Sequence, residues 1–209
     1  MSRLDAAQLY ERFYGDGRSR RGVFEAIAGW RAPARALYPG SFIHVAASFE
    51  IPHVTYVDTD RRARRFFAAR EQVLAVVRAE KRYDGPPSFD FIGGSYEHPL
   101  DLPDASHDLL VSLYAGFISK PCKRYLAIGG VLVANNSHGD AGLAAIDPDY
   151  ALVGVLAGRT DRLRVSEDAL DTYLVPKSGT PPTEEQLRRL GRGVAYTRPA
   201  VAYLFRRLR

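Results

Sequence analysis

The sequence predicts an α/β protein built on a doubly wound, mostly parallel sheet, with extra helices at its N- and C-terminal ends. Short apolar runs with the composition of buried strands alternate with longer segments whose apolar residues recur at helical spacing. The strongest strand candidates are apolar almost throughout, as expected when helices cover both faces of a parallel sheet. The chain of 209 residues has the length of a single ordinary domain.

The expected elements follow one another in a regular order. Two helices open the chain, over Leu4–Tyr14 and Arg21–Trp30, and the loop GDGRSR separates them because it is rich in glycine and aspartate. Further helices are expected at 41–50 and 61–82. Strands are expected where short runs are β-branched, aromatic or otherwise apolar, at 34–38, 54–58, 88–94, 107–116, 125–135 and 150–156.

The last part of the chain is predicted to be helical. Thr183 follows two prolines and precedes Gln186 by three positions, which is the pattern of a capped helix start. The final residues carry apolar side chains at i, i+3, i+4 and i+7, namely Val201, Leu204, Phe205 and Leu208. Such a stripe has to be covered, either by the sheet of the same chain or by a second copy in a homodimer.

We expect three parts in one compact unit: an N-terminal helical cap at 1–32, a sheet-bearing domain at 33–176 and a basic helical extension at 177–209. Positive charge is concentrated in the last of these parts. From Arg188 onward there are seven arginines and no acidic residue, which leaves 22 basic against 24 acidic residues before that point. Such a tail can contact nucleic acid through sequence-independent electrostatics. An arginine-laced solvated helix face is the favoured interpretation.

Composition indicates a globular protein of a reducing compartment. Hydrophobic residues make up 46% and charged residues 25%, and no apolar run approaches the roughly 18 residues that a membrane-spanning helix needs. The first residues mix charges with apolar positions and lack the apolar core of a signal peptide. The single cysteine, Cys122, excludes an internal disulfide, and the histidines lack metal-ligand spacing. We expect a cytoplasmic protein without a metal.

Two segments are expected to bind a ligand because they follow the first two strands of the predicted sheet. In an open parallel sheet, ligands bind outside the carboxyl ends of the strands. Gly40 follows Tyr38 and precedes Ser41, so a glycine turn stands before the next element and allows close approach. Asp58 and Thr59 end the second strand, 18 residues after the glycine, where an acid is placed to accept hydrogen bonds from ribose hydroxyls.

Two further segments follow the third and fourth strands. Ser95 and Tyr96 come directly after Gly93-Gly94, and Tyr114 lies between Leu113 and Ala115 at the end of the fourth strand candidate. By the same topological argument these side chains belong to the same edge of the sheet. Tyr114 is as readily a core aromatic residue as a wall of the site.

The sequence resembles the class I S-adenosylmethionine-dependent methyltransferases over residues 34–156. VTYVDTDRRARRFF is similar to the second strand and following helix of that family, DLPDASHDLLVSLYAGF to the segment leading into the fourth strand, and RYLAIGGVLVANN to the fifth. The resemblance implies a methyltransferase-like Rossmann domain with S-adenosylmethionine as cofactor.

The resemblance also assigns roles to the segments at the strand ends. It implies that Asp58 holds the ribose, that backbone around Tyr38–Ser41 lies near the amino-acid end of the cofactor, and that Ser95 and Tyr96 border the adenine. Tyr114 would line the site. The first loop, ALYPGSF, departs from the family pattern because it has one glycine and no acid, and its proline removes an N–H donor.

The residues that follow the fifth strand are the candidates for acceptor chemistry. Methyl transfer from a sulfonium mainly requires alignment and, for some acceptors, a base. His138 is the candidate base because its ordinary pKa lies near neutrality, and Asp140 would orient it. Alternatively, Asn136, Ser137 and Asp140 cap the helix that begins near Gly139.

Two functional hypotheses follow from the sequence. The first is a methyltransferase that uses S-adenosylmethionine to modify a small-molecule acceptor. The second is a non-catalytic protein of the same fold that serves as a binding protein or partner subunit. The retained Asp58 favours the first hypothesis, and the altered first loop favours the second.

Overall fold

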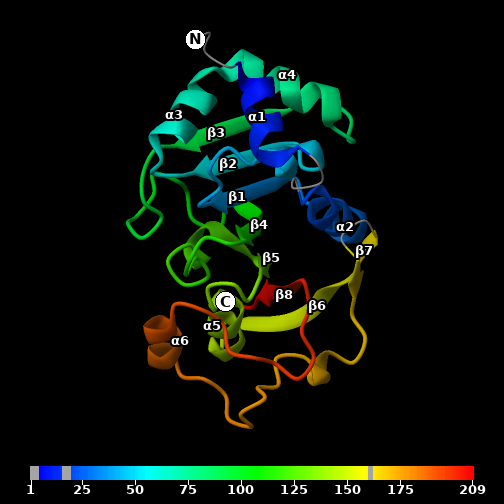
Figure 1. The fold of residues 1–209 in the computed structure, drawn as a ribbon, viewed down its shortest axis with the longest axis vertical. Coiled ribbons are helices and arrows are strands. Elements are labelled where there is room, and N and C mark those ends of the chain that lie inside the picture. Colours follow the sequence, from blue (N-terminus) through cyan, green and yellow to red (C-terminus); the bar gives the residue numbers. More distant parts are fainter. Residues whose placement is uncertain (1–4, 16–19, 160–161) are drawn as a thin grey trace.

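Eight strands form one mixed sheet in this computed structural model, which describes residues 5–15, 20–159 and 162–209 (Figure 1). Their order across the sheet is β3-β2-β1-β4-β5-β8-β6-β7. The strands span Arg35–Pro39 (β1), His53–Val57 (β2), Ser88–Ile92 (β3), His107–Ser112 (β4), Leu126–Ala134 (β5), Tyr150–Arg159 (β6), Arg162–Ser166 (β7) and Ala202–Arg207 (β8).

The order in which successive strands are added to the sheet reverses at β1. Strands β3, β2, β1, β4 and β5 pair in parallel in that spatial order. Strand β8 lies antiparallel between β5 and β6, and β7 forms an antiparallel hairpin with β6. The chain therefore extends from β1 through β2 to β3 and then crosses to the other side of β1 for β4. The carboxyl ends of β1 and β4 flank this switch point, where open α/β sheets bind ligands.

Helices cover both faces of the sheet. Figure 1 shows α1, α3 and α4 gathered over the end of the sheet that holds β2 and β3, and α5 and α6 near its other end. In the described residues, no helix is both long and apolar enough to cross a bilayer. The helices span Ala6–Tyr14 (α1), Arg21–Arg31 (α2), Ala46–Phe49 (η1), Arg61–Ala68 (α3), Arg70–Glu80 (α4), Lys123–Tyr125 (η2), Asp140–Ile146 (α5), Leu170–Thr172 (η3) and Glu184–Leu190 (α6).

Alternate residues of the central strands contribute to two separate cores. On β4, Leu109 and Val111 join the cluster that includes α1, α2 and α4, whereas Leu110 joins the cluster that includes α5. On β8, Leu204 belongs to the first cluster and Phe205 to the second. Because both faces of these strands are buried, their sequences are apolar almost without interruption.

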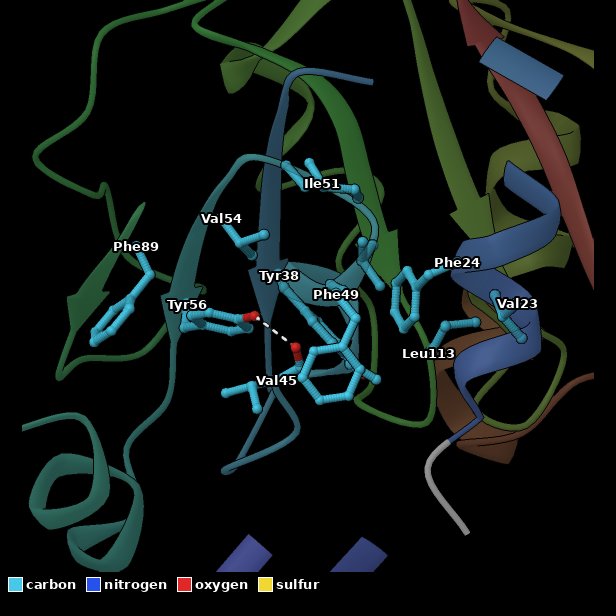
Figure 2. Packing of buried hydrophobic residues seen from close by; sticks show 14 of the residues in the cluster. Val23, Phe24, Tyr38, Val45, Phe49, Ile51, Val54, Tyr56, Phe89 and Leu113 are labelled. Atoms are coloured by element: carbon cyan, nitrogen blue, oxygen red, sulfur yellow. Dashed lines mark hydrogen bonds between the residues drawn. The ribbon is translucent and has the colours of Figure 1, made fainter. Parts of the chain in front are cut away.

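An aromatic layer packs over β1 and β2 (Figure 2). Tyr56 stacks on Phe67 with their ring centroids 4.8 Å apart, and the centroid of Tyr38 lies 6.1 Å from that of Tyr56. The Tyr56 hydroxyl lies 2.6 Å from Ser48 Oγ and donates to the Val45 carbonyl at 3.4 Å, so the cost of burying this polar group is offset. The layer thereby holds the segment after β1 against the sheet.

Most of the expected elements are confirmed. The first two helices and the six expected strands are present, with boundaries that differ from the prediction by a few residues. Thr183 begins α6 with the expected capping box, in which its side chain accepts the backbone N–H of Gln186. The expected start at Leu4 and most of the loop GDGRSR lie outside the described residues.

Two of the expected helices form differently. The helix expected at 41–50 was wrong, because only η1 forms there. Phe42 has a φ of +50° and donates its N–H to the Asp58 carboxylate, and this conformation cannot start an α-helix. The helix expected at 61–82 is divided into α3 and α4 at Ala69, whose ψ is 54°. There the Arg70 side chain donates to the Phe89 carbonyl and ties the new helix start to β3.

The final helix was also wrong, because those residues form β8 inside the sheet. Positions 202–205 are all buried, as in a central strand that is covered on both faces. The two outer positions of the supposed helical stripe, Val201 and Leu208, are instead 41% and 44% exposed. A homodimer contact through a C-terminal helix, as expected from the sequence, therefore cannot form, because these residues are a strand of the sheet.

We predict that stability falls as the pH drops from about 6.5 to 4 because His107 is buried. Its Nε2 lies 3.1 Å from Thr55 Oγ1, and burial, with a contribution from the positive charge of Arg35, lowers its pKa from 6.5 to about 4. Between these values the unfolded chain binds a proton that the folded chain does not, so the unfolding free energy decreases by up to about 1.4 kcal/mol per pH unit.

Urea denaturation across this pH range provides the test. In His107→Gln, the slope of the unfolding free energy against pH should decrease by the contribution of one bound proton. In His98→Gln, at an exposed position, the slope should equal that of the wild type. Equal slopes for the three proteins would show that His107 does not carry the effect.

Candidate functional site

The carboxyl ends of β1 and β2 meet at one edge of the sheet. Gly40 follows β1 with a φ of +65°, and its N–H donates to the Val57 carbonyl at 2.8 Å. The Asp58 carboxylate accepts the Phe42 N–H at 2.6 Å through Oδ2 and the Asp60 N–H at 2.8 Å through Oδ1. The structure therefore brings the Gly40 turn and Asp58 together, and Asp58 holds the first loop in place.

A second loop covers Gly40. A side chain built on Gly40 would overlap the Cβ of Ala115, which follows β4. The Tyr96 hydroxyl donates to the Ala115 carbonyl at 3.4 Å, and a side chain on Gly116 would meet the same hydroxyl. The turn after β1 is thus in contact with the chain's own residues at the position where the expected cofactor would approach it.

The remaining predicted cofactor residues differ in accessibility. Tyr38 is buried, and its hydroxyl lies 2.9 Å from Nδ1 of His44, so its side chain belongs to the core. Ser41 is also buried, so neither of these two residues presents an accessible side chain to a ligand. Thr59 is exposed beside Asp58. Ser95 is half-buried and its Oγ accepts the N–H of Glu97.

Tyr114 directly precedes Ala115 in the loop that follows β4. It is 49% exposed and has a φ of +60°, which is unusual for a residue with a bulky side chain. The guanidinium of Arg20 lies over its ring, 3.8 Å from the centroid. The Tyr114 N–H points to Oδ1 of Asn135 at 3.4 Å, which connects the end of β4 to the end of β5.

A cavity of about 720 Å³ opens beside Tyr114, between the ends of β4 and β5, the start of α2 and the paired residues at the end of β6 and the start of β7. We call it the hairpin cavity. Of the predicted cofactor residues, Tyr114 alone is among the described residues that line it. The lining residues are Arg20, Arg21, Gly22, Val23, Glu25, Leu113, Tyr114, Asn135, Gly158, Arg159, Arg162, Leu163, Val201 and Ala202. The volume is that of a typical small-molecule site.

A buried carboxylate fixes the loop that separates the Gly40 turn from the hairpin cavity. Asp140, at the start of α5, accepts hydrogen bonds from Ser112 Oγ at 2.5 Å and from the backbone N–H groups of Ile118 and Ser119 at 3.1 Å and 2.9 Å. The Ser119 hydroxyl donates to its other oxygen at 2.5 Å. Burial raises the pKa of Asp140, and these hydrogen bonds oppose that rise.

His138 and Asp140 do not form the expected pair. His138 is exposed, Asp140 is buried, and no ion pair joins them in the part of the chain that the structure describes. The orienting role assigned to Asp140 is corrected on this ground, because its acceptor positions face the β4 loop. The alternative, in which Asn136, Ser137 and Asp140 cap α5, was also wrong, because the N-cap position is Gly139 and no side chain caps the first turn of this helix.

The basic C-terminal segment is largely engaged in contacts with its own chain. Arg207 donates to the carbonyls of Lys123 and Leu126, and Arg209 pairs with Asp149 at 2.5 Å. Arg188 forms an ion pair with Glu184, and Arg198 donates to Thr172 Oγ1. Contact with nucleic acid through these arginines stays a prediction.

Sequence reasoning missed the residues that surround Tyr114. The run from Gly158 to Leu163 carries a hairpin signal, a glycine and short polar residues between apolar runs, and that signal places Arg159 and Arg162 near each other. Nothing in the local sequence indicates that Arg20 reaches Tyr114, or that Ala115 covers Gly40, because both contacts join distant segments.

Comparison with known proteins identifies the architecture. No protein-family model and no curated sequence matches the chain. Among solved structures, a methyltransferase from Geobacter sulfurreducens matches with a TM-score of 0.50 and 14% identity, over 74% of this chain and 86% of that chain. The chain therefore has the methyltransferase-like Rossmann fold that the sequence resemblance implied.

Two further structures are similar at lower TM-scores. The O-methyltransferase TomG from Streptomyces achromogenes, in complex with S-adenosylmethionine, gives 0.46 with 15% identity over 77% of this chain and 84% of that chain. A Burkholderia thailandensis 1,6-didemethyltoxoflavin-N1-methyltransferase with bound S-adenosylhomocysteine gives 0.46 with 14% identity over 94% of this chain and 81% of that chain.

We predict that Asp140→Ala lowers the unfolding free energy by about 2–4 kcal/mol, because it leaves two buried backbone N–H groups and two serine hydroxyls without their acceptor. Asp140→Asn keeps one oxygen for the backbone groups, and its amide can donate to Ser119 Oγ, so its loss should be about 1 kcal/mol. Urea denaturation measures both.

His138→Ala is the control and should change the unfolding free energy by less than about 0.5 kcal/mol, because the side chain is exposed. If Asp140→Ala were as stable as this control, the carboxylate would not be what fixes the loop.

Proposed function

We propose that the chain binds S-adenosylmethionine along the carboxyl ends of β1 and β2 and transfers its methyl group to a small molecule held at the ends of β4 and β5. One observation carries this proposal: the Gly40 turn, which borders the switch point of a methyltransferase-like sheet, meets the Asp58 carboxylate at the end of the neighbouring strand. The hairpin cavity, at the same edge of the sheet, supplies room for an acceptor.

The residues at the end of β2 fit the ribose of such a cofactor. Each oxygen of the Asp58 carboxylate accepts one backbone N–H, and a carboxylate oxygen can accept a second hydrogen bond. Asp58 is half-buried rather than enclosed, and Thr59 beside it is exposed. Two ribose hydroxyls therefore have acceptor positions available on a carboxylate that the loop already orients.

The turn after β1 fits the cofactor once Ala115 has moved away from Gly40. Tyr114 and Gly116 flank this alanine with φ values of +60° and +76°, and the proposal requires this segment to shift although Asp140 holds the residues that follow it. A state in which the segment is displaced has to be populated before binding, and that requirement weakens the apparent affinity.

The chain's own residues contribute alignment and proton transfer. The cofactor, when bound, supplies an electrophilic methyl group. Asp140 is a positioning residue because it fixes the loop that carries Tyr114 and Ala115. His138 is exposed in the segment after β5 and lies outside the described lining of the hairpin cavity, and it stays the candidate base for acceptors that require deprotonation.

S-Adenosylhomocysteine is the probe for the cofactor site. We predict that it raises the melting temperature, because a ligand present at about 100 times its Kd stabilises the native state by about 2.7 kcal/mol. Asp58→Asn should raise the Kd at least about tenfold in isothermal titration calorimetry, since it removes a charged acceptor. Asp60→Asn is the matched control, because that carboxylate already binds Arg62.

Ala115→Gly should lower the Kd for S-adenosylhomocysteine by removing the methyl group that covers Gly40. Ala105→Gly, in a different loop, should leave it unchanged. If neither the wild type nor Ala115→Gly binds S-adenosylhomocysteine at millimolar concentration, the methyltransferase proposal is refuted, and a non-catalytic protein of the same fold takes its place.

A further inference from the structure

The hairpin cavity carries an excess of positive charge that no carboxylate in the described residues neutralises. Glu25 is the single acid among its described lining residues, and it pairs with Arg21 at 3.1 Å and with Arg82 at 2.6 Å. Arg21 is further held by Glu50 and Glu80. These side chains satisfy one another and leave the other three lining arginines without an acidic partner in the described part of the chain.

Two of those arginines lie directly opposite each other across the hairpin. Arg159 and Arg162 are paired in register on β6 and β7, so both side chains project from the same face, and both are exposed. Like charges in directly opposed positions destabilise a strand pair. A bound anion would convert this repulsion into two charge-assisted contacts.

The third arginine approaches the cavity from the start of α2. Arg20 precedes this helix with a φ of +48°, and its guanidinium lies over the ring of Tyr114, whose own φ is +60°. The contact with the ring holds the guanidinium in one orientation while its N–H groups stay available. The cavity therefore receives positive charge from the start of α2 and from the paired strands β6 and β7.

Much of the remaining lining is apolar, although it includes the amide side chain of Asn135. Val23, Leu113, Leu163, Val201 and Ala202 contribute side chains from α2, the end of β4, the hairpin and the start of β8. An inorganic anion would contact only the arginines and leave this apolar surface in water. A molecule with one anionic group and an apolar body matches both parts of the lining.

We propose that the hairpin cavity binds an anionic small molecule that carries a carboxylate or phosphate group on an apolar, aromatic-sized body. Arg159 and Arg162 bind the anionic group, and Arg20 adds a third positive charge from the start of α2. The apolar lining residues pack against the apolar body of the ligand. This inference rests on the proposed function where it names the class of the methyl acceptor; the binding site itself does not require the cofactor.

The arginine cluster on α3 lies outside the hairpin cavity, and two of its members, Arg62 and Arg65, line a separate cavity with Asp5. On α3, Arg62 pairs with Asp60 at 2.7 Å, and Arg64 donates to the Gly93 carbonyl at 2.9 Å. Arg61 and Arg65 of the same helix are exposed and line no part of the hairpin cavity. They provide a matched control because their replacement removes the same two charges.

Fluorine NMR with para-trifluoromethylbenzoate as the probe tests the proposal on the full chain without cofactor. The neutral isostere para-trifluoromethylbenzamide reports whether the charge is needed, and para-trifluoromethylphenyl phosphate distinguishes the two anionic groups. We expect one of the two anions to bind at least about tenfold more tightly than the amide, because charge-assisted hydrogen bonds to arginine are lost in the latter.

The variant Arg159→Gln/Arg162→Gln should weaken binding of the preferred anion at least about tenfold, whereas Arg61→Gln/Arg65→Gln should change it less than about twofold. Arg20→Gln should give an intermediate loss, since it removes one of three cations. Equal binding of the benzamide, or equal losses in the two double variants, would overturn the proposal. Melting temperatures of the variants without probe establish that they are folded.

The outcome is separable from that of the proposed function. Anion binding together with an absence of any response to S-adenosylhomocysteine would leave this site standing and refute the methyltransferase. A response to S-adenosylhomocysteine without anion binding would refute this inference alone. If both ligands bind, both proposals stand, and each ligand should change the affinity of the other, because the loop whose Ala115 covers Gly40 also carries Tyr114 of the cavity.

Discussion

The carboxylate of Asp140 is the constraint on which the candidate site depends. It is 1% exposed, and its two oxygens gather donors from the end of β4 and from the loop that follows. A buried carboxylate without such partners would be strongly unfavourable, so the network and the loop conformation require each other. The strained Tyr114 backbone lies inside the segment that this network closes, and the network supplies the support that such strain needs.

One loop therefore determines the state of two neighbouring regions. Within it, Ala115 contacts the Gly40 turn, and Tyr114 forms a wall of the hairpin cavity. A movement that uncovers the turn has to reposition Tyr114 and the guanidinium stacked on it. Cofactor and acceptor sites that share a movable loop have coupled affinities, and linkage requires the coupling to be reciprocal.

The parts of the fold that the sequence predicted are those with a local signal. The strands of the parallel half, the first two helices and the capping box at Thr183 are specified by adjacent residues. β8 was misread because an apolar run of five residues fits a buried strand and a helical stripe alike, and only its neighbours in the sheet decide between them. The helix at 41–50 failed because Asp58, distant in sequence, binds Phe42.

The contrast between local sequence signals and contacts of distant segments also explains which features of the site could be predicted. That Gly40 and Asp58 lie together follows from topology, since both end adjacent parallel strands. Their accessibility does not follow, because it depends on Ala115 from a third strand end. The burial of Asp140 likewise depends on Ser119 and on packing across the sheet, which no pattern of adjacent residues encodes.

The position of β8 has a consequence for how the protein is made. Its residues 202–207 fill the gap between β5 and β6, although both of those strands are synthesised earlier. Until this segment leaves the ribosome, two long apolar strand edges stay open side by side, and open edges of that kind invite pairing with other chains. The nascent protein thus passes through a stage in which chaperone protection matters more than for a sheet that is completed strand by strand.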